Sequence, residues 1–136
     1  MASYKIPEDC LYTKGDTWIR RDADGVIRMG ITDYAQQKLR KIEYLSLPEE
    51  GETVEQFEAL GEIESMKSLS ELMAPVTGSV ALVNEEATDQ PGVVNEDPYG
   101  RGWILAINCD RFDEQSAELL DAQAYRAYRG IEQSVL

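Results

Sequence analysis

Residues 62–78, with the sequence EIESMKSLSELMAPVTG, hold one lysine, Lys67, between two runs of strand-forming residues. Ile63 precedes it and Leu72 follows it within apolar runs at strand spacing, and the polar tetrad SMKS (65–68) separates the runs. Such a pattern predicts a hairpin, within about residues 51–84, whose tip carries Lys67 into solvent. A lysine at a hairpin tip can be reached by a second protein.

Two residues after the tip are expected to shape this hairpin. We predict that Pro75 lies at the start of the return strand, because proline cannot donate a hydrogen bond to a β-ladder. Gly78 should follow it and allow a sharp bend.

The chain is strongly acidic. Its 136 residues include 26 acidic and 13 basic residues, for a formal net charge of −13 and a pI near 4.3. This length suits one compact core, so we expect a single domain spanning residues 1–136. Nucleic acid and anionic membranes are poor partners for such a charge. The N-terminal residues lack the apolar core of a secretory signal, so we expect a cytoplasmic protein. We also expect a monomer.

Histidine, the residue that several common catalytic sites require, is absent. The sequence contains no histidine, which excludes Ser/His/Asp triads, Cys/His dyads and HExxH zinc sites. Cys10 and Cys109 form no CxxC pair, and we interpret them as bystander thiols rather than metal ligands or a redox pair. Walker-type and GxGxxG phosphate loops are also absent from the sequence. We therefore expect no metal site and no conventional hydrolase, kinase or dehydrogenase activity.

Turn and capping residues predict the other elements of a mainly β fold. Asp24-Gly25 predicts a hairpin over residues 17–31, and Thr32-Asp33 predicts a short helix that follows it. A strand is expected at 42–47, and mostly short strands and turns between residues 53 and 107.

The last third of the chain combines a turn with helix-forming residues. Residues 95–103, NEDPYGRGW, predict a compact turn, and Trp103 at its end is expected in the core. Residues 112–133 predict a C-terminal helical segment, broken near Asp121.

The residues around Lys67 resemble the lipoyl and biotinyl carrier domains, in which a lysine at a hairpin tip carries the cofactor. The residues at matching spacing are Gly51, Val54, Leu60, Ile63, Glu64, Lys67, Glu71, Ala74-Pro75 and Gly78. Further segments resemble the glycine cleavage system H-protein family in the same order, over about residues 6–128. These segments are IPEDCLYTK, GITDYAQQKL, LPEEGETV, APVTGSVALVNE, VVNEDPYGRGW and LLDAQAY.

This resemblance implies a barrel-sandwich hybrid with short flanking helices and lipoate in amide linkage to Lys67. The attachment hairpin would include Glu64, Ser65, Met66 and Ser68. In this family the dithiolane accepts an aminomethyl group from glycine decarboxylase and passes it to an aminomethyltransferase. Dihydrolipoyl dehydrogenase then reoxidises it. A lipoate-attachment enzyme is the remaining implied partner, and the carrier itself is a substrate rather than a catalyst.

Departures from the family pattern keep alternatives open. The family usually reads His-Glu-Trp where this chain has Asp16, Thr17 and Trp18, and Glu71 replaces a shorter acid. Asp16, Thr17 and Glu71 are the residues that the resemblance places at a cleft for the arm. The changed cleft suits an H-like lipoate carrier that serves sulfur-compound oxidation with a heterodisulfide-reductase-like complex.

Two further readings depend on the lysine itself. Met66-Lys67 is half of the Met-Lys-Met signature of biotinyl carriers, although Ser68 replaces the second methionine. An interaction module that never carries lipoate is the third alternative.

Overall fold

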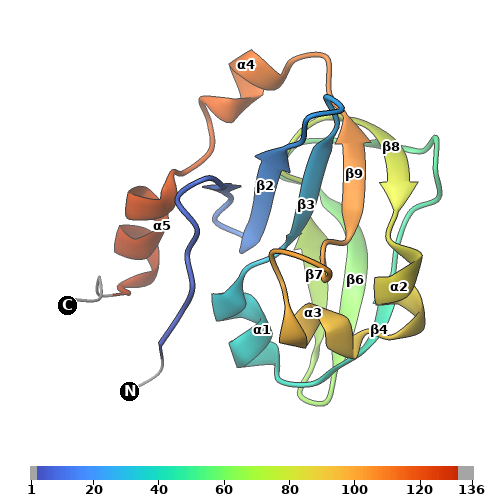
Figure 1. Cartoon of the computed structure of the whole chain (residues 1–136), viewed down its shortest axis with the longest axis vertical. Helices are drawn as coiled ribbons and strands as arrows, with labels where there is room; N and C mark the ends of the chain where they lie inside the picture. Colours follow the sequence, from blue (N-terminus) through green and yellow to red (C-terminus); the bar gives the residue numbers. More distant parts are fainter. Residues whose placement is uncertain (1–2, 132–136) are drawn as a thin grey trace.

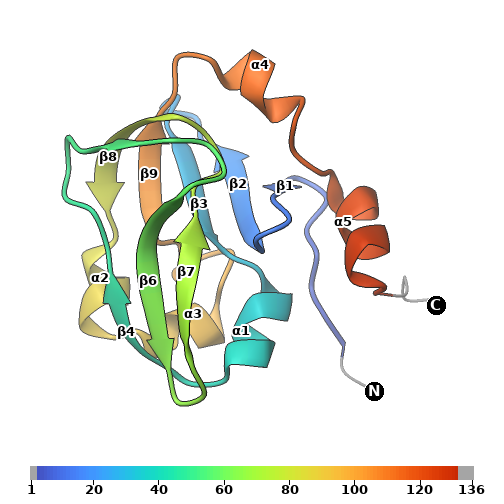
Figure 2. The same cartoon turned by 180° about the vertical axis from the view of Figure 1, so that it is seen from behind.

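The computed structural model describes residues 3–131, which form two antiparallel sheets with short helices around them (Figures 1 and 2). The larger sheet has the strand order β1-β2-β3-β9-β8-β5. Its strands are β1 (Leu11–Tyr12), β2 (Thr17–Arg21), β3 (Ile27–Ile31), β5 (Thr53–Val54), β8 (Gly78–Val83) and β9 (Leu105–Asn108). The smaller sheet has the order β4-β6-β7 and consists of β4 (Ile42–Ser46), β6 (Ala59–Ser65) and β7 (Leu69–Met73). The expected mainly β, barrel-sandwich architecture is confirmed.

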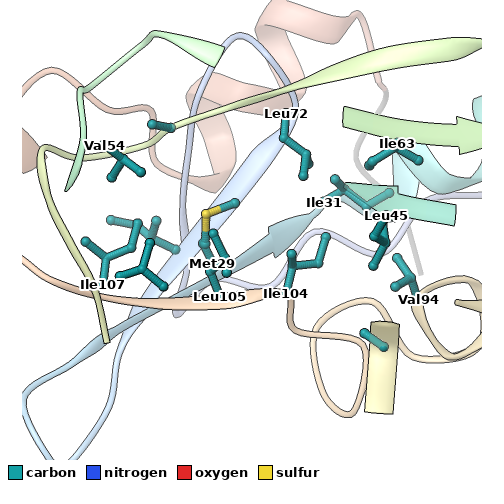
Figure 3. Close-up of a cluster of buried hydrophobic side chains, with 14 of the residues drawn as sticks. Met29, Ile31, Leu45, Val54, Ile63, Leu72, Val94, Ile104, Leu105 and Ile107 are labelled. Atoms are coloured by element: carbon teal, nitrogen blue, oxygen red, sulfur yellow. The ribbon is translucent and has the colours of Figure 1, made fainter. Parts of the chain in front are cut away.

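The main hydrophobic core lies between the two sheets (Figure 3). Period-2 alternation places Leu45, Ile63 and Leu72 on the inner face of the small sheet. They meet side chains from the large sheet, including Met29 and Leu105, and all five are at most 3% exposed. Burial of this apolar surface is the dominant stabilising term for the fold.

Capping residues set the ends of the longer helices. In α1 (Asp33–Leu39), the Thr32 hydroxyl accepts a hydrogen bond from the Ala35 amide at 3.1 Å. In α5 (Ala122–Arg129), the Asp121 carboxylate accepts from the Ala124 amide at 2.8 Å. Gly130 ends α5 in the left-handed conformation, with φ 67°. The predicted hairpin at 17–31, the helix after Thr32 and the break near Asp121 are confirmed.

The sequence expectations miss two helices. Residues between 53 and 107 include α2 (Glu85–Asp89) and α3 (Gly92–Glu96), in a region where the sequence predicts mostly strands and turns. Asn84 caps α2, and Asn95 belongs to the last turn of α3 rather than to the predicted compact turn. Five-residue helices are too short to show a helical period in the sequence. Their buried residues, Ala87, Val93 and Val94, join the main core.

Two smaller expectations are also corrected. Pro75 lies beyond the end of β7, in the connection to β8, and Gly78 begins β8 instead of closing the hairpin. As expected, Trp103 packs against a buried cluster, which includes Tyr12 and Trp18, although its own side chain is only partly buried. The Arg28 guanidinium lies 4.3 Å from its ring centroid. The C-terminal helical segment consists of α4 (Phe112–Ser116) and α5, and the predicted residues 132–133 lie outside the described residues.

Candidate functional site

Lys67 lies at the tip of the β6-β7 hairpin, in the connection formed by residues 66–68. The hairpin extends away from α4 in both views of the molecule (Figures 1 and 2). Met66, Lys67 and Ser68 are all exposed, and 69% of the Met66 surface is accessible. The amine is therefore carried on a solvent-accessible connection between two ordered strands.

The Ser65 hydroxyl closes this turn. It accepts hydrogen bonds from the backbone amides of Lys67 at 3.2 Å and Ser68 at 3.1 Å. It also donates to the Ser68 carbonyl at 3.1 Å, and the Ser65 amide donates to the same carbonyl at 2.9 Å. A side-chain oxygen thus takes the place of a backbone carbonyl in the turn.

This arrangement explains how the turn avoids the backbone strain of a tight hairpin. Two-residue hairpin turns of the favoured types need at least one residue with positive φ. Among residues 3–131, positive φ outside glycine occurs at Asp16, Arg40 and Phe57, so Met66 and Lys67 keep negative φ values. Since Ser65 is 94% buried, its hydroxyl is fixed beneath the turn.

The base of the tip is held by the end of α1 and by α3. The Met66 amide donates to the Lys41 carbonyl at 3.0 Å. On either side of Lys41, the Asn95 side chain accepts from the Ile42 amide at 3.0 Å and donates to the Arg40 carbonyl at 2.8 Å. Arg40 has φ 69°, an unfavourable value that these contacts help to hold. Sequence reasoning missed this role of Asn95, because no local pattern links it to residue 66.

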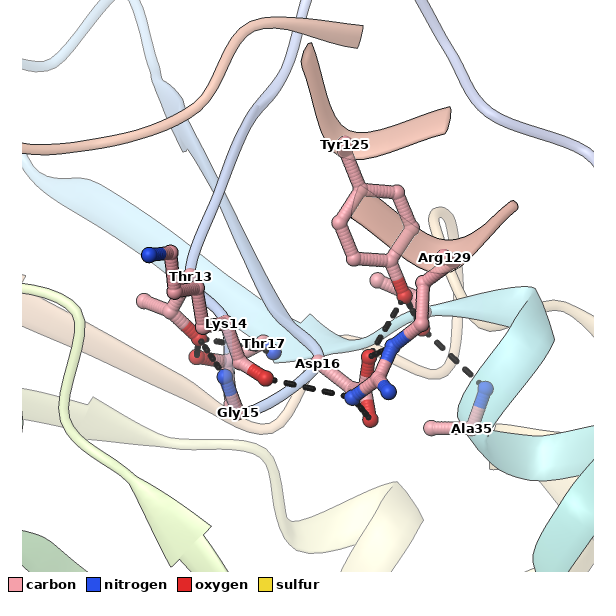
Figure 4. Close-up of polar contacts among 9 residues, drawn as sticks. Thr13, Lys14, Gly15, Asp16, Thr17, Ala35, Tyr125 and Arg129 are labelled. Atoms are coloured by element: carbon pink, nitrogen blue, oxygen red, sulfur yellow. Dashed lines mark hydrogen bonds and ion pairs between the residues drawn. The ribbon is translucent and has the colours of Figure 1, made fainter. Parts of the chain in front are cut away.

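Asp16 lies in a second polar cluster, far along the sequence from the tip residues (Figure 4). Arg129 donates to both of its carboxylate oxygens, at 2.8 Å from Nε and 2.6 Å from Nη2. The Tyr125 hydroxyl donates to the same carboxylate at 2.7 Å. We call Asp16, Tyr125 and Arg129 the C-terminal latch, because they join the loop before β2 to α5.

Aromatic packing extends the latch into a second core. The Tyr125 ring stacks on Tyr12 with centroids 4.7 Å apart, and its hydroxyl lies 2.8 Å from that of Thr32. Burial raises the pKa values of Tyr12 and Tyr125. Trp18 is completely buried in this core, and its indole donates to the Pro98 carbonyl at 3.0 Å.

The three residues predicted for an arm cleft lie in different environments. Thr17 is fully buried, and its hydroxyl lies 2.7 Å from that of Thr13. Asp16 is engaged in the latch, and its side chain is 19% exposed. Glu71 is exposed on β7. Gly15 packs against Met73, two residues after Glu71, so the loop before β2 does approach the base of β7.

Neither cysteine lies at the tip. Cys10 is 1% exposed, and burial together with neighbouring Asp9 raises the pKa of its thiol to about 12. Cys109 is partly buried, and burial also raises its thiol pKa. Within residues 3–131, no group of three or more His, Cys, Asp or Glu residues is placed to hold a metal ion. In the same part of the chain, no helix is long and apolar enough to cross a membrane.

Fold and site together define a class: a barrel-sandwich domain that presents an exposed lysine on a hairpin tip. The comparisons with known proteins then identify the family. The family model described as "Glycine cleavage H-protein" matches residues 10–130. The chain belongs to the glycine cleavage H-protein family.

Relatives and a solved structure agree with this assignment. The chain is 46% identical over 128 residues to a "Probable glycine cleavage system H protein" of Pyrococcus furiosus, covering 94% of this chain and 95% of that protein. It is 47% identical over 126 residues to a "Glycine cleavage system H protein" of Mycobacterium bovis, covering 89% and 94%. A crystal structure of a glycine cleavage system H protein from Mycobacterium marinum superposes with a TM-score of 0.83 at 39% identity, covering 92% of this chain and 99% of that one.

Proposed function

We propose that this protein carries lipoate in amide linkage to Lys67 and acts as the aminomethyl carrier of glycine cleavage. The observation that carries the proposal is the exposed lysine on a hydrogen-bonded hairpin tip in a chain of the H-protein family. Attached lipoate would supply a dithiolane that exchanges bonds and electrons with successive enzymes. The proposed partners are glycine decarboxylase, an aminomethyltransferase and dihydrolipoyl dehydrogenase, in the cytoplasm.

Attachment needs an activated lipoyl group and a lipoate-attachment enzyme. We propose an acyl adenylate, formed from lipoate and ATP with release of pyrophosphate, as the activated donor. The Lys67 amine, once deprotonated, attacks its carbonyl carbon; the amide C–N bond forms, the bond to AMP breaks, and a further proton leaves the nitrogen. The chain contributes the nucleophile and its position. The attachment enzyme supplies the rest, which agrees with a non-catalytic carrier.

The tip fits a covalently attached arm. Ser65 accepts hydrogen bonds from the backbone amides of Lys67 and Ser68 and so fixes the backbone of the turn. The mobility of the arm therefore comes from the side chain of Lys67. Met66 and Ser68 leave the amine open on both sides, and Glu64 lies one strand residue before Ser65. Such ordering lowers the entropy lost when a modifying enzyme binds the turn.

Of the three cleft residues, we propose that Glu71 alone faces the arm. Its carboxylate is exposed on the strand that leaves the tip. Asp16 and Thr17 instead serve the structure, because their polar atoms are already bound within the protein. The family's glutamate before the tryptophan therefore has no replacement among these two residues.

The test starts with the unmodified protein, free lipoate, ATP and a purified lipoate–protein ligase. Intact mass and peptide mapping should show one lipoyl group, located on Lys67. Lys38→Arg, a change at another exposed lysine, should leave modification unchanged, whereas Lys67→Arg should abolish it. A lipoyl group elsewhere, or none, would reject the proposal.

A second step distinguishes glycine cleavage from the alternatives. The lipoylated protein should support exchange of labelled bicarbonate into glycine when mixed with glycine decarboxylase. Failure of this exchange, combined with reduction by a heterodisulfide-reductase-like complex, would favour the sulfur-oxidation carrier. Biotin incorporation at Lys67 would favour a biotinyl carrier. The names of the relatives support glycine cleavage over both.

A further inference from the structure

The outer face of the small sheet carries two rows of exposed side chains. The strand register aligns Tyr44, Glu64 and Leu69 across β4, β6 and β7. The next row along the sheet consists of Ser46, Glu62 and Glu71. All six residues are exposed, while the neighbouring Leu45, Ile63 and Leu72 point into the core. We call these six residues, with Met66, the outer face. In the view of Figure 2, no helix formed by the described residues 3–131 crosses the small sheet.

The row nearest the tip is unusually apolar for a surface. Tyr44 is 58% exposed, Leu69 62% and Met66 69%. Three of the six large hydrophobic residues that are exposed within residues 3–131 therefore lie beside Lys67 or on the row next to it. Single exposed apolar residues need no explanation, but a group of them on one face indicates a contact surface.

The charge of the molecule is concentrated in the same part of the chain. Residues 42–100 contain fourteen acidic residues and a single basic residue, Lys67. The remaining residues contain twelve acidic and twelve basic residues, so the whole formal net charge of −13 falls within residues 42–100. This segment includes all three strands of the small sheet. Lys67 is therefore a cation within an otherwise anionic stretch of chain.

We propose that the outer face is the docking surface for the enzyme that attaches lipoate to Lys67. That enzyme would present an apolar patch to Tyr44, Met66 and Leu69, bordered by Lys and Arg side chains that face Glu62 and Glu64. The inference rests on the proposed function and specifies the chemistry of one partner. Opposite charges would accelerate the encounter and orient the tip toward the active site.

The charge argues against other occupants of this face. A second copy of the chain would bring two anionic surfaces together, and like charges in an interface are unfavourable. An anionic membrane or a nucleic acid would be repelled for the same reason. A protein with a cationic border satisfies both the carboxylates and the apolar row.

Steady-state lipoylation of the unmodified protein tests the proposal. Two variants change the outer face without touching the attachment turn: Tyr44→Thr, which keeps a residue suited to a strand, and Glu62→Lys. Their controls are Leu82→Thr, an exposed apolar strand residue of the other sheet, and Glu118→Lys, an exposed acid between α4 and α5. Circular dichroism and Tm would establish that all four variants fold.

We expect each outer-face variant to raise KM for the carrier by about fivefold to tenfold, with kcat within about twofold, as for a residue that contributes to binding. Added salt should raise the KM of the native protein, and Glu62→Lys should weaken this dependence. Each control should stay within about twofold of the native KM.

The possible results separate the two proposals. If the native protein is lipoylated on Lys67 but the outer-face variants behave like their controls, docking through this face is rejected and the carrier function stands. A change confined to kcat would also reject docking. If Lys67 of the native protein accepts no lipoate, the proposed function fails and the docking inference fails with it.

Discussion

The hairpin tip and the C-terminal latch show two ways of ordering polar groups. At the tip, Ser65 bonds groups two and three residues away, and the amine beside it remains exposed. In the latch, Asp16 contacts residues 109 and 113 positions later, and its side chain is largely buried. Local bonds order the backbone of the tip and leave its lysine accessible. The long-range bonds of the latch join two segments that are far apart in the sequence. The polar groups of the latch are already hydrogen-bonded to one another.

This contrast means that function and stability should respond to different residues. A change at the tip should alter modification and barely alter unfolding. A change in the latch should lower the stability of the fold and barely alter modification, because the latch joins the loop before β2 to α5 and does not contact the hairpin tip.

Replacing Lys67 gives the largest expected effect. Lys67→Arg removes the primary amine, so incorporation of lipoate should fall to background in the ligase assay. Because the Lys67 side chain is exposed, the free energy of unfolding of the variant should differ from that of the native protein by less than about 0.5 kcal/mol. A large fall in Tm, measured by scanning calorimetry, would contradict this view by showing that Lys67 supports the fold.

Breaking the latch should have the largest effect on stability. Arg129→Met leaves the Asp16 carboxylate with Tyr125 alone, and we expect a loss of about 2–3 kcal/mol, less than for a fully buried pair. Urea denaturation would measure it. Arg111→Met is the matched control: its ion pair with Glu114 is mostly exposed and should contribute under about 1 kcal/mol. Equal losses of stability in both variants would show that the latch contributes no more than an exposed ion pair. Impaired lipoylation of folded Arg129→Met would contradict the separation between a latch for stability and a tip for modification.

Ser65→Ala should loosen the tip without unfolding the protein. Loss of the hydroxyl removes three hydrogen bonds of the turn, for a cost of about 1 kcal/mol or slightly more. We expect KM for lipoylation to rise about twofold to fivefold, because the turn is less ordered before binding. Ser70→Ala, on the strand that follows, serves as the control. An unchanged KM in Ser65→Ala would show that the preformed turn is unimportant for modification.

Alkaline pH should weaken the second core, which includes Cys10, Tyr12 and Tyr125. We expect this to be the smallest of the effects, and it should be negligible at neutral pH. The folded Cys10 thiol keeps its proton to about pH 12, whereas an ordinary thiol loses it near 9.0, so its contribution to stability falls as pH rises through this interval. The raised pKa values of Tyr12 and Tyr125 act in the same direction. Stability measured from pH 8 to 10.5 should decline, and Cys10→Ala should decline less steeply. Parallel slopes would contradict the role of Cys10.

Sequence reasoning succeeded where the responsible residues are neighbours along the chain. Thr32 and Asp121 cap helices, and Asp24-Gly25 forms a turn, through contacts within a few residues. The placement of Lys67 on a hairpin tip followed from alternation in the same local way. The register of the two strands then decides which residues share the outer face. A shift of one residue would exchange the outward-facing side chains with those that face the core.

The remaining features depend on distant partners. The bond between Asp16 and Arg129 has no local signal, so the sequence does not predict the latch. Asn95 supports the tip from α3, and the residues that it contacts are more than 50 positions away. The helices α2 and α3 are stabilised by burial against the main core rather than by their own propensity. The closing role of Ser65 was accessible in principle, since serine hydroxyls often bond amides two or three residues later.

The separation of Asp16 from Arg129 also sets an order of events during synthesis of the chain. The strand pairing of the hairpin lies entirely within residues 59–73, and hairpins form in about 1–10 μs, far faster than a ribosome adds residues. Asp16 is among the first residues to be made, yet its partner comes 113 positions later. The loop before β2 must therefore wait for nearly the entire chain, while the hairpin that carries Lys67 can already have closed.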